Sequence, residues 1–307
     1  MTQPSSPPLL ELRQVSRAYT SGALLSGRQV LALKDFSLTI DADRPSITAV
    51  VGESGSGKTT MARLVLGLEA PTAGRVLYDG KDLNSLNATD WRDFRRSVQA
   101  IFQDPFGVYN PFYKVDHVLT TPLRKFKLAT SREDEHARIE EALRAVGLRP
   151  EETLGRYPHQ LSGGQRQRTM VARILLLRPR LIVADEPVSM IDASLRTTVL
   201  GNLLQLKRRF GMSLIYITHD LTTAYQISDR IVVLHRGEVV EEGDPEQIVH
   251  HPVHAYTRLL INSIPEPDPD QAWADDALLD DEGEDDLEVV NSASGLVTLD
   301  SSSKHKG

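Results

Sequence analysis

The stretch at residues 52–60 places glycines, a lysine and two threonines at a spacing that can hold phosphate. It matches G-x-x-x-x-G-K-[ST], with an apolar run at 47–51 before it and a helix-like stretch at 61–68 after it. Glycines let backbone N–H groups turn inward around an anion, and the helix N-terminus adds its own N–H groups and positive dipole end. Lys58 would reach the β- and γ-phosphates, and the Thr59 hydroxyl would ligate Mg²⁺. The stretch therefore predicts a nucleoside triphosphate site.

Two carboxylates follow the apolar run at 181–184. Such a run is typical of a buried strand in a parallel sheet, and ligands bind at the carboxyl ends of such strands. Asp185 would hold Mg²⁺, directly or through water. Glu186 would orient or deprotonate an attacking water. Beside the 52–60 stretch, this pair predicts a hydrolase.

A second glycine-containing element lies at residues 161–165, Leu-Ser-Gly-Gly-Gln. Ser162 resembles the N-cap of a helix over 166–177, and the glycines expose N–H groups at its positive end. Taken by itself, this element could be either the end of a well-capped helix or a second anion site. Its pairing with the first phosphate element favours the second interpretation.

Composition narrows the class of protein. The 307 residues are 40% hydrophobic and 25% charged, as in an ordinary globular chain. No apolar run approaches the roughly 18–20 residues of a membrane helix, and residues 1–8 are polar and proline-rich, unlike a signal peptide. The absence of cysteine excludes disulfides, thiolate zinc sites and cysteine-held iron–sulfur clusters. These features indicate a cytosolic protein.

Charge divides the chain in two. Residues 266–307 contain thirteen acidic residues and two lysines, which leaves residues 1–265 with a net charge of +4 although the whole chain carries −7. A mildly basic body suits phosphate binding or approach to an anionic membrane face. The acidic tail, rich in proline and serine, and the leader at 1–8 are expected to be disordered.

Apolar periodicity predicts the elements that position these groups. Alternation at 9–19 and 30–40 indicates two antiparallel strands. Helical periodicity dominates from 89 to 178, and a βαβ succession follows. The other elements expected are strands at 47–51, 75–79, 181–184, 213–218, 231–234 and 238–241, and helices at 61–68, 132–146, 166–177 and 195–210.

Four motifs together resemble the nucleotide-binding subunit of ATP-binding cassette (ABC) transporters. They are the P-loop at 52–59, LSGGQRQR at 161–168, LIVADEP at 181–187 and ITHD at 217–220. The resemblance covers about residues 9–265. It implies an α/β fold: a P-loop NTPase core with an antiparallel β subdomain, a helical subdomain inserted at about 89–178, and a C-terminal extension at about 243–265.

The resemblance assigns roles to individual residues. Gln103 matches the glutamine that contacts the metal and the lytic water, and His219 matches the histidine that bonds the γ-phosphate. Asp192 matches the D-loop aspartate, and Tyr19 stands where family members stack an aromatic ring on adenine. The nucleotide-binding set is Tyr19, Gly52, Ser54, Gly55, Gly57, Lys58, Thr59, Thr60, Ser162, Gly163, Gly164, Gln165 and Asp192. The catalytic set is Glu186, His219 and Gln103, and the metal ligands are Thr59, Gln103 and Asp185.

The family also implies partners. Two such subunits bind head-to-tail around two ATP molecules, so Ser162 and Gly164 would touch the γ-phosphate held by the partner. A paralogous partner ATPase is favoured over a second copy. Two permease subunits and, through the complex, an extracytoplasmic substrate-binding protein complete the expected importer at the cytoplasmic face of the inner membrane. ATP and Mg²⁺ are the expected cofactors, and no nucleic acid is expected.

The expected cargo follows from two further segments. Residues 103–111 and 251–260 resemble the corresponding segments of importers of oligopeptides, dipeptides and nickel. Two positions depart from the usual pattern: Ala255 stands where a proline is usual, and Met190 stands where a small residue is usual. Peptide is favoured; nickel, sugar and glutathione are alternatives. A soluble ABC ATPase acting on DNA or ribosomes would usually carry tandem cassettes, coiled-coil arms or zinc motifs. A catalytically weak structural partner would have replaced Glu186 or His219.

Overall fold

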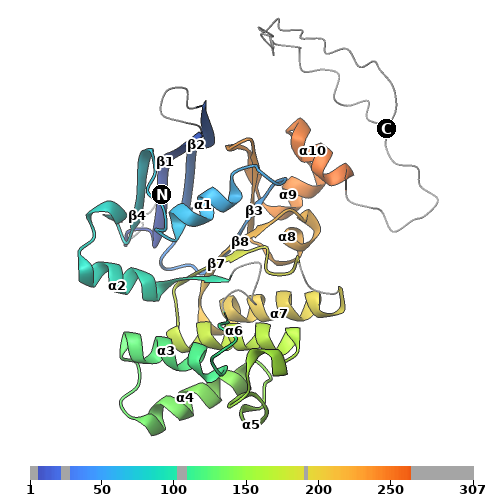
Figure 1. The fold of residues 1–307 in the computed structure, drawn as a ribbon. Helices are drawn as coiled ribbons and strands as arrows, with labels where there is room; N and C mark the ends of the chain where they lie inside the picture. The colour runs from blue at the N-terminus through green and yellow to red at the C-terminus, as the bar shows by residue number, and fades with distance from the viewer. Residues whose placement is uncertain (1–5, 22–27, 102–108, 190–192, 264–307) are drawn as a thin grey trace, which may run out of the picture. The chain divides into compact units, whose positions relative to one another are not determined.

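A six-stranded sheet forms the centre of the fold in the computed structural model, which describes residues 6–21, 28–101, 109–189 and 193–263 (Figure 1). Its order is β10 (Glu238–Gly243), β9 (Arg230–His235), β3 (Ile47–Val51), β8 (Ser213–Thr218), β7 (Leu181–Asp185) and β6 (Val98–Ile101). All neighbours pair in parallel except β10, which runs antiparallel to β9. The predicted α/β class is confirmed.

Both faces of this sheet are buried, which explains the continuous apolar runs. One face, which includes Val50 and Val183, packs toward the small sheet and α1 (Lys58–Val65). The other face, which includes Ala49 and Ile182, packs against helices. Those helices are α6 (Gly163–Leu177), α7 (Ala193–Phe210) and α8 (Leu221–Ile227).

A four-stranded antiparallel sheet covers one side of the core, as alternation at the N-terminus predicts. Its order is β2 (Arg28–Ile40), β1 (Leu10–Ser21), β4 (Ala73–Tyr78) and β5 (Lys81–Asp82). Leu10, Leu12 and Val15 are all buried although their spacing changes from two to three. A register shift between Leu12 and Val15, with Gln14 at φ 45°, returns the apolar side chains to the core face.

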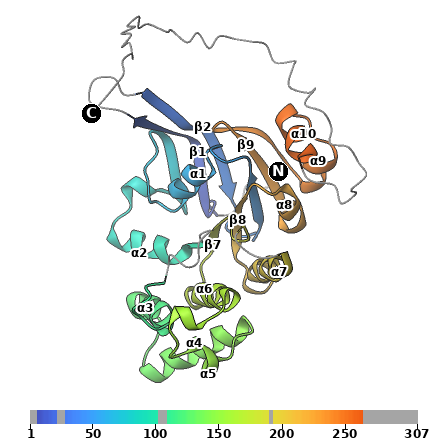
Figure 2. The same cartoon turned by 45° about the vertical axis from the view of Figure 1, so that its right-hand side comes forward.

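A group of helices follows the first half of the core (Figure 2). It comprises α3 (Asp116–Phe126), α4 (Arg132–Ala145), α5 (Pro150–Thr153) and α6, with a 3₁₀ turn at Pro158–Gln160. α4 begins at Ser131, whose side chain accepts from the Asp134 N–H, and ends before Gly147 at φ 71°. Both ends agree with the capping signals.

The start of the helical region differs from the expectation of a helical insertion that begins at about residue 89. After the 3₁₀ turn Leu83–Ser85, α2 (Ala88–Ser97) runs directly into β6, which pairs with β7 in the large sheet. No glycine or proline separates α2 from β6, so the sequence has no breaker at this point. The helical insertion therefore begins after Ile101.

The residues after the large sheet form two short helices, α9 (Pro245–His250) and α10 (Ala255–Asn262). The described residues, all of which lie before residue 264, form one compact unit. No helix in the described ranges is both long and apolar enough to span a bilayer. The expected disordered leader at 1–8 falls on described residues only at 6–8, which form neither helix nor strand, and the expected disordered tail at 266–307 lies outside the described residues.

Candidate nucleotide site

Three strands bring the predicted chemistry to one edge of the large sheet. Val51 pairs with Thr218 and Asp185 pairs with Ile217 in the parallel register. The P-loop that follows β3, the carboxylates that end β7 and His219 after β8 therefore leave the sheet together. Carboxyl ends of parallel strands are where ligands bind in such sheets.

Glycine is required at two positions of the P-loop for steric reasons. Gly57 has φ 109°, and a Cβ there would lie 2.5 Å from the Ala32 carbonyl oxygen. A Cβ at Gly52 would lie 2.2 Å from the Leu234 carbonyl oxygen. Gly55, at φ 85°, has no heavy atom within 4 Å of a Cβ, so the loop is open on that side. Two glycines pack the loop against the core, and the third leaves space beside it.

The Lys58 side chain turns back onto the P-loop. Its Nζ donates to the carbonyl oxygens of Gly52 and Glu53, both at 2.6 Å. Burial lowers the pKa of Lys58, opposed by the charges of Glu186, Asp185 and Glu53. A buried ammonium that faces these carboxylates is placed to move onto an incoming phosphate.

The N-terminus of α1 has donors available for an anion. Its N-cap, Gly57, provides no side-chain cap, and the first turn contains no acidic residue. Helix N-terminal N–H groups and the dipole favour phosphate there. Thr59 is exposed and Thr60 is half-buried in this first turn, as the phosphate-site prediction requires. The structure also leaves Ser54 exposed at the open side of the loop.

Asp185 and Glu186 have different environments although they are adjacent. Burial, and next the charge of Glu186, raise the pKa of Asp185. Glu186 has φ 45°, a left-handed conformation that is uncommon for a non-glycine residue. Its N–H donates to the Ile217 carbonyl at 2.9 Å, and its carbonyl accepts from the Ser189 hydroxyl at 3.0 Å. Sparsely populated backbone conformations cluster at functional sites, and this one lies at the predicted base, next to the predicted metal ligand.

Glu186 contacts His219 directly. Oε1 of Glu186 lies 3.1 Å from Nδ1 of His219. The His219 side chain is 59% exposed and that of Glu186 20%. The imidazole therefore bonds the carboxylate with one nitrogen while most of the ring remains accessible to a ligand.

Tyr19 belongs to a charged cluster beside α1. Its hydroxyl donates to Glu69 at 2.6 Å, and the Arg17 guanidinium lies 4.8 Å from the ring centroid. Glu69 also pairs with Arg17 and Arg63, and the pKa of its carboxyl is lowered, first by the Tyr19 hydrogen bond. These contacts fix the orientation of the Tyr19 ring. Sequence reasoning named Tyr19 but missed the residues that hold it.

The second predicted anion element forms a reciprocal cap on α6. The Ser162 side chain accepts from the Gln165 N–H at 3.2 Å, and the Gln165 side chain accepts from the Ser162 N–H at 2.9 Å. Ser162 and Gly163 are exposed, and Gly164 is half-buried. These capping bonds join residues of the α6 N-terminus to each other. Helix α6 packs on α3 and α4. Helix α1, which follows the P-loop, packs on β1, β2 and β7. The N-terminal end of α6 is therefore solvent-exposed at Ser162 and Gly163.

Two predicted residues are not placed by the structure. Gln103 and Asp192 lie outside the described residues. The strand before Gln103, β6, ends at the same edge as β7, because Ile101 pairs with Ala184.

Sequence reasoning missed a contact between the P-loop and α10. The Glu53 N–H donates to the hydroxyl of Tyr256 at 2.9 Å. Tyr256 lies in α10, more than 200 residues later in the chain. No periodicity or motif spacing could indicate a contact over that separation.

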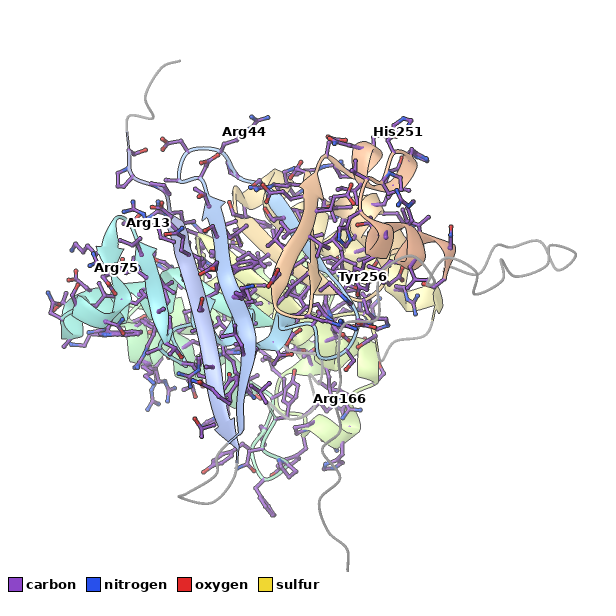
Figure 3. All side chains as sticks on the ribbon, turned by 90° about the horizontal axis from the view of Figure 1, so that it is seen from above. Arg13, Arg44, Arg75, Arg166, His251 and Tyr256 are labelled. Carbon is purple, nitrogen blue, oxygen red and sulfur yellow. The ribbon has the colours of Figure 1, made fainter. Side chains whose placement is uncertain are left out.

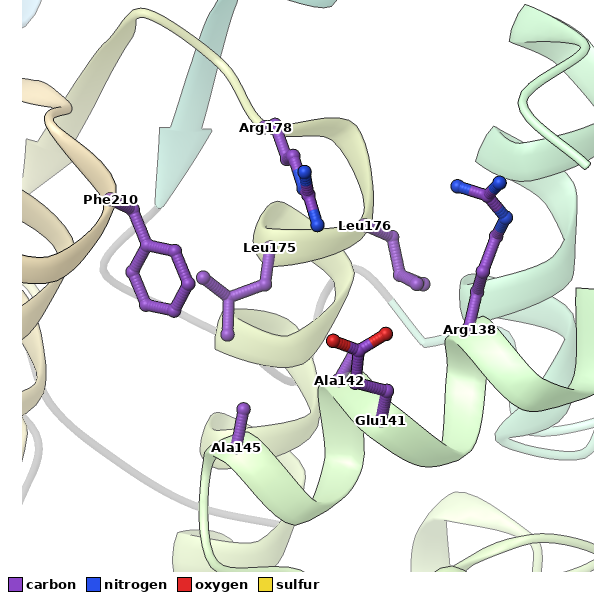
Figure 4. Close-up of a pocket in the computed structure, with 8 residues that line it drawn as sticks. All are labelled: Arg138, Glu141, Ala142, Ala145, Leu175, Leu176, Arg178 and Phe210. Carbon is purple, nitrogen blue, oxygen red and sulfur yellow. The ribbon is translucent and has the colours of Figure 1, made fainter.

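Two hollows of the described surface lie outside this site. The smaller, about 70 Å³, is lined from α4, α6 and α7, with Leu175 and Phe210 beside Glu141 and Arg178 (Figure 4). The larger is a groove of about 880 Å³ between α2, β6, α3 and α6. None of the predicted nucleotide residues lines either hollow.

Comparison with known families decides the classification. The model of the family described as "ABC transporter" matches residues 33–189, and that of the "Oligopeptide/dipeptide transporter, C-terminal region" matches residues 240–285. The first match covers the P-loop, LSGGQ and both carboxylates. This chain belongs to the ABC transporter ATPases. The second match reaches beyond residue 265, where the sequence predicted the extension to end.

Individual relatives agree with this classification. The ABC ATPase is 45% identical to the oligopeptide transport ATP-binding protein OppF of Salmonella typhimurium over 72% of this chain, and it spans 66% of that protein. It is 38% identical to OppF of Streptococcus mutans over 85% of this chain and 83% of that one.

Solved structures agree on the fold. The ABC ATPase is 29% identical to the ATP-binding cassette MJ0796, solved as a dimer with ADP and Pi, with a TM-score of 0.65 over 77% of this chain and 98% of that one. The fold also matches cbiO1 of Clostridium perfringens, at 24% identity and a TM-score of 0.67 over 80% and 91% of the two chains. The predicted P-loop NTPase fold is confirmed.

The residues present suit Mg²⁺ bound together with phosphate. No cluster of three His, Asp or Glu side chains able to hold an ion occurs in the described part of the ABC ATPase. Mg²⁺ commonly takes one or two protein oxygens plus phosphates and waters. Thr59 and the desolvated Asp185 supply oxygens of this kind.

Proposed function

We propose that this ABC ATPase is the ATP-hydrolysing subunit of a peptide importer. The observation that carries the proposal is the pairing of the P-loop, Asp185 and Glu186 at one sheet edge with a C-terminal region matching that of oligopeptide and dipeptide transporters. Relatives named as oligopeptide transport ATP-binding proteins support the cargo class. Oligopeptides or dipeptides are the cargo we infer.

Each residue at the sheet edge has a proposed task in hydrolysis. Lys58 leaves its loop carbonyls and holds the β- and γ-phosphates. Thr59 and Asp185, with Gln103, would hold Mg²⁺, which would neutralise phosphate charge when bound. Glu186 orients or deprotonates the attacking water, and His219, fixed by Glu186, bonds the γ-phosphate.

The remaining nucleotide residues divide between two subunits. Backbone groups from Gly52 to Thr60 cradle the phosphates, and the Tyr19 ring stacks on adenine. The exposed end of α6, residues 162–165, contributes to ATP held by a second ATPase subunit, for which a paralogue is favoured. Asp192 would lie at the same junction. This division explains why one chain has two phosphate-binding elements whose hydrogen bonds stay apart.

The groove between α2, β6, α3 and α6 suits a helix of a membrane permease. Its wall combines apolar Trp91, Phe94 and Leu177 with cationic Arg95 and Arg173. Arg95 lies over the Trp91 ring, and burial lowers the pKa of Arg173. A permease segment with an apolar face and a carboxylate would complement this wall. The proposed location is therefore peripheral, at the cytoplasmic face of the inner membrane.

The absence of cysteine makes the docking proposal testable by cross-linking. Thr121→Cys, in the groove wall, is expected to cross-link to a permease in membranes, whereas Arg75→Cys, exposed on β4, is not. Equal cross-linking from both positions would contradict docking at this groove.

Cargo is tested by uptake in cells that lack the gene. Loss of labelled oligopeptide or dipeptide uptake, restored by the wild-type gene, is the expected result. Nickel, a sugar and glutathione serve as competing cargoes. Unchanged peptide uptake with loss of one of these would contradict the peptide assignment.

A further inference from the structure

The C-terminal helix α10 reaches the P-loop through one hydroxyl group. Tyr256, in the first turn of α10, is 8% exposed, and its hydroxyl oxygen accepts from the Glu53 N–H at 2.9 Å. Figure 3 labels Tyr256 together with His251, which lies between α9 and α10. The contact joins a segment outside the nucleotide core to the phosphate-binding loop.

Glu53 is also a residue to which the phosphate-binding lysine is bound. Its carbonyl oxygen accepts from Lys58 Nζ at 2.6 Å, while its N–H is held by Tyr256. When phosphate arrives, Lys58 must leave this carbonyl. The Tyr256 bond does not involve the lysine, so it can hold Glu53 in place during that change.

Tyr256 itself is fixed from several sides. Its ring lies against His235, with centroids 3.9 Å apart at 35°. The His254 side chain caps α10 at the Tyr256 N–H at 3.1 Å. The carboxylate of Glu241 accepts from the N–H groups of Val253 and His254 at 2.8 and 3.0 Å. These contacts fix the position of Tyr256, so its hydroxyl group is held beside the Glu53 N–H.

We propose that Tyr256 is a positioning residue for ATP binding, which holds the start of the P-loop in its phosphate-receiving shape. The inference rests on the proposed ATP site. It adds that the C-terminal region sets the affinity of that site for ATP. A preorganised loop binds phosphate without first being ordered, so loss of the anchor weakens binding more than it slows chemistry.

The test removes one oxygen atom. Tyr256→Phe keeps the ring against His235 and deletes the acceptor of the Glu53 N–H. We expect MgATP to bind about 3- to 10-fold more weakly, as for loss of one hydrogen bond, with KM for ATP raised and kcat nearly unchanged. The matched control is Tyr225→Phe, which removes the hydroxyl that donates to Glu246 of α9 at 2.7 Å. This control also loosens the C-terminal region, and we expect its MgATP affinity to stay within about twofold of wild type.

Amide hydrogen exchange gives a second measurement without nucleotide. In the wild-type protein the Glu53 amide is expected to exchange slowly, and in Tyr256→Phe faster, with peptides from β1 unchanged. MgATP affinity of Tyr256→Phe equal to wild type would overturn the inference. So would fast Glu53 exchange in wild type, a result that holds even if the variant does not fold. A wild-type protein that binds no MgATP would instead overturn the proposed ATP site.

Discussion

Nδ1 of His219 lies 3.1 Å from Oε1 of Glu186, across the neighbouring ends of β8 and β7. The contact joins a largely exposed imidazole to a mostly buried carboxylate. Glu186 has a left-handed backbone at this point, held by bonds to Ile217 and Ser189. The proposed base and the proposed γ-phosphate sensor thus orient each other.

Glu186→Gln is expected to reduce ATP turnover by about 100-fold or more, because glutamine cannot accept the proton of the attacking water. The amide keeps the size of the side chain, so MgATP binding is retained and the paired subunits stay closed around ATP. Phosphate release and light scattering measure the two effects. Glu140→Gln, on α4, is the control for loss of a carboxylate. Wild-type turnover in Glu186→Gln would remove Glu186 from the role of base.

Lys58→Ala is expected to weaken nucleotide binding more than tenfold, because the ammonium that faces phosphate is lost and two loop carbonyls lose their donor. Lys34→Ala removes an exposed lysine paired with Glu238 and serves as the matched control. Fluorescent nucleotide titration measures both dissociation constants. Equal affinities of wild type and Lys58→Ala would contradict the P-loop assignment.

Asp185→Asn separates stability from function. Because burial and Glu186 raise the pKa of Asp185 in the folded protein, its ionised form destabilises the fold at neutral pH. This penalty is fully present above the raised pKa and disappears as pH falls below the ordinary value of 3.8. Allowing for solvent screening, the Asn variant is expected to melt about 1–3 °C higher at pH 7.5, with a smaller difference at pH 4.

The control for this prediction is activity in the same samples. Mg²⁺-dependent ATP turnover is expected to fall in Asp185→Asn although the fold gains stability, because an amide is a poorer Mg²⁺ ligand than a carboxylate. A lower melting temperature of Asp185→Asn at pH 7.5, or an equal rise in melting temperature at both pH values, would show that burial of the ionised Asp185 carboxylate does not destabilise the fold.

Gly57→Ala and Gly201→Ala test the loop against a helix. At Gly57 a methyl group would meet the Ala32 carbonyl at 2.5 Å with φ at 109°, so we expect a loss of about 1–3 kcal/mol. At Gly201, inside α7, a Cβ has no neighbour within 4 Å, and we expect a gain of about 0.5–1 kcal/mol. Urea unfolding measures both. A tolerated Gly57→Ala would mean that the loop has another shape in solution.

Local patterns predicted most of the fold because most of its elements have a sequence signal of their own. Continuous apolar runs predicted β3, β7 and β8, and Ser131 and Gly147 marked the ends of α4. The start of the helical region was placed too early because α2 passes into β6 without a breaker. A strand of four residues behind a helix has too little periodicity of its own to be recognised.

The candidate site was predictable where motifs carry it and not where tertiary contacts do. Lys58, Asp185 and His219 follow from spacing and resemblance, and the sheet register brings them together. The anchors of the site do not follow in this way. Glu69 holds Tyr19 from 50 residues away, and Tyr256 holds Glu53 from 203 residues away. Such contacts depend on the folded packing, which short-range periodicity does not encode.

Peptide uptake by cells whose only copy of the gene encodes Glu186→Gln tests the central claim most directly. The variant is made at the wild-type level, and uptake of a labelled oligopeptide is compared with wild type and with the deletion strain. If ATP hydrolysis by this chain drives peptide import, uptake falls to the level of the deletion strain. Uptake at the wild-type rate would contradict the account.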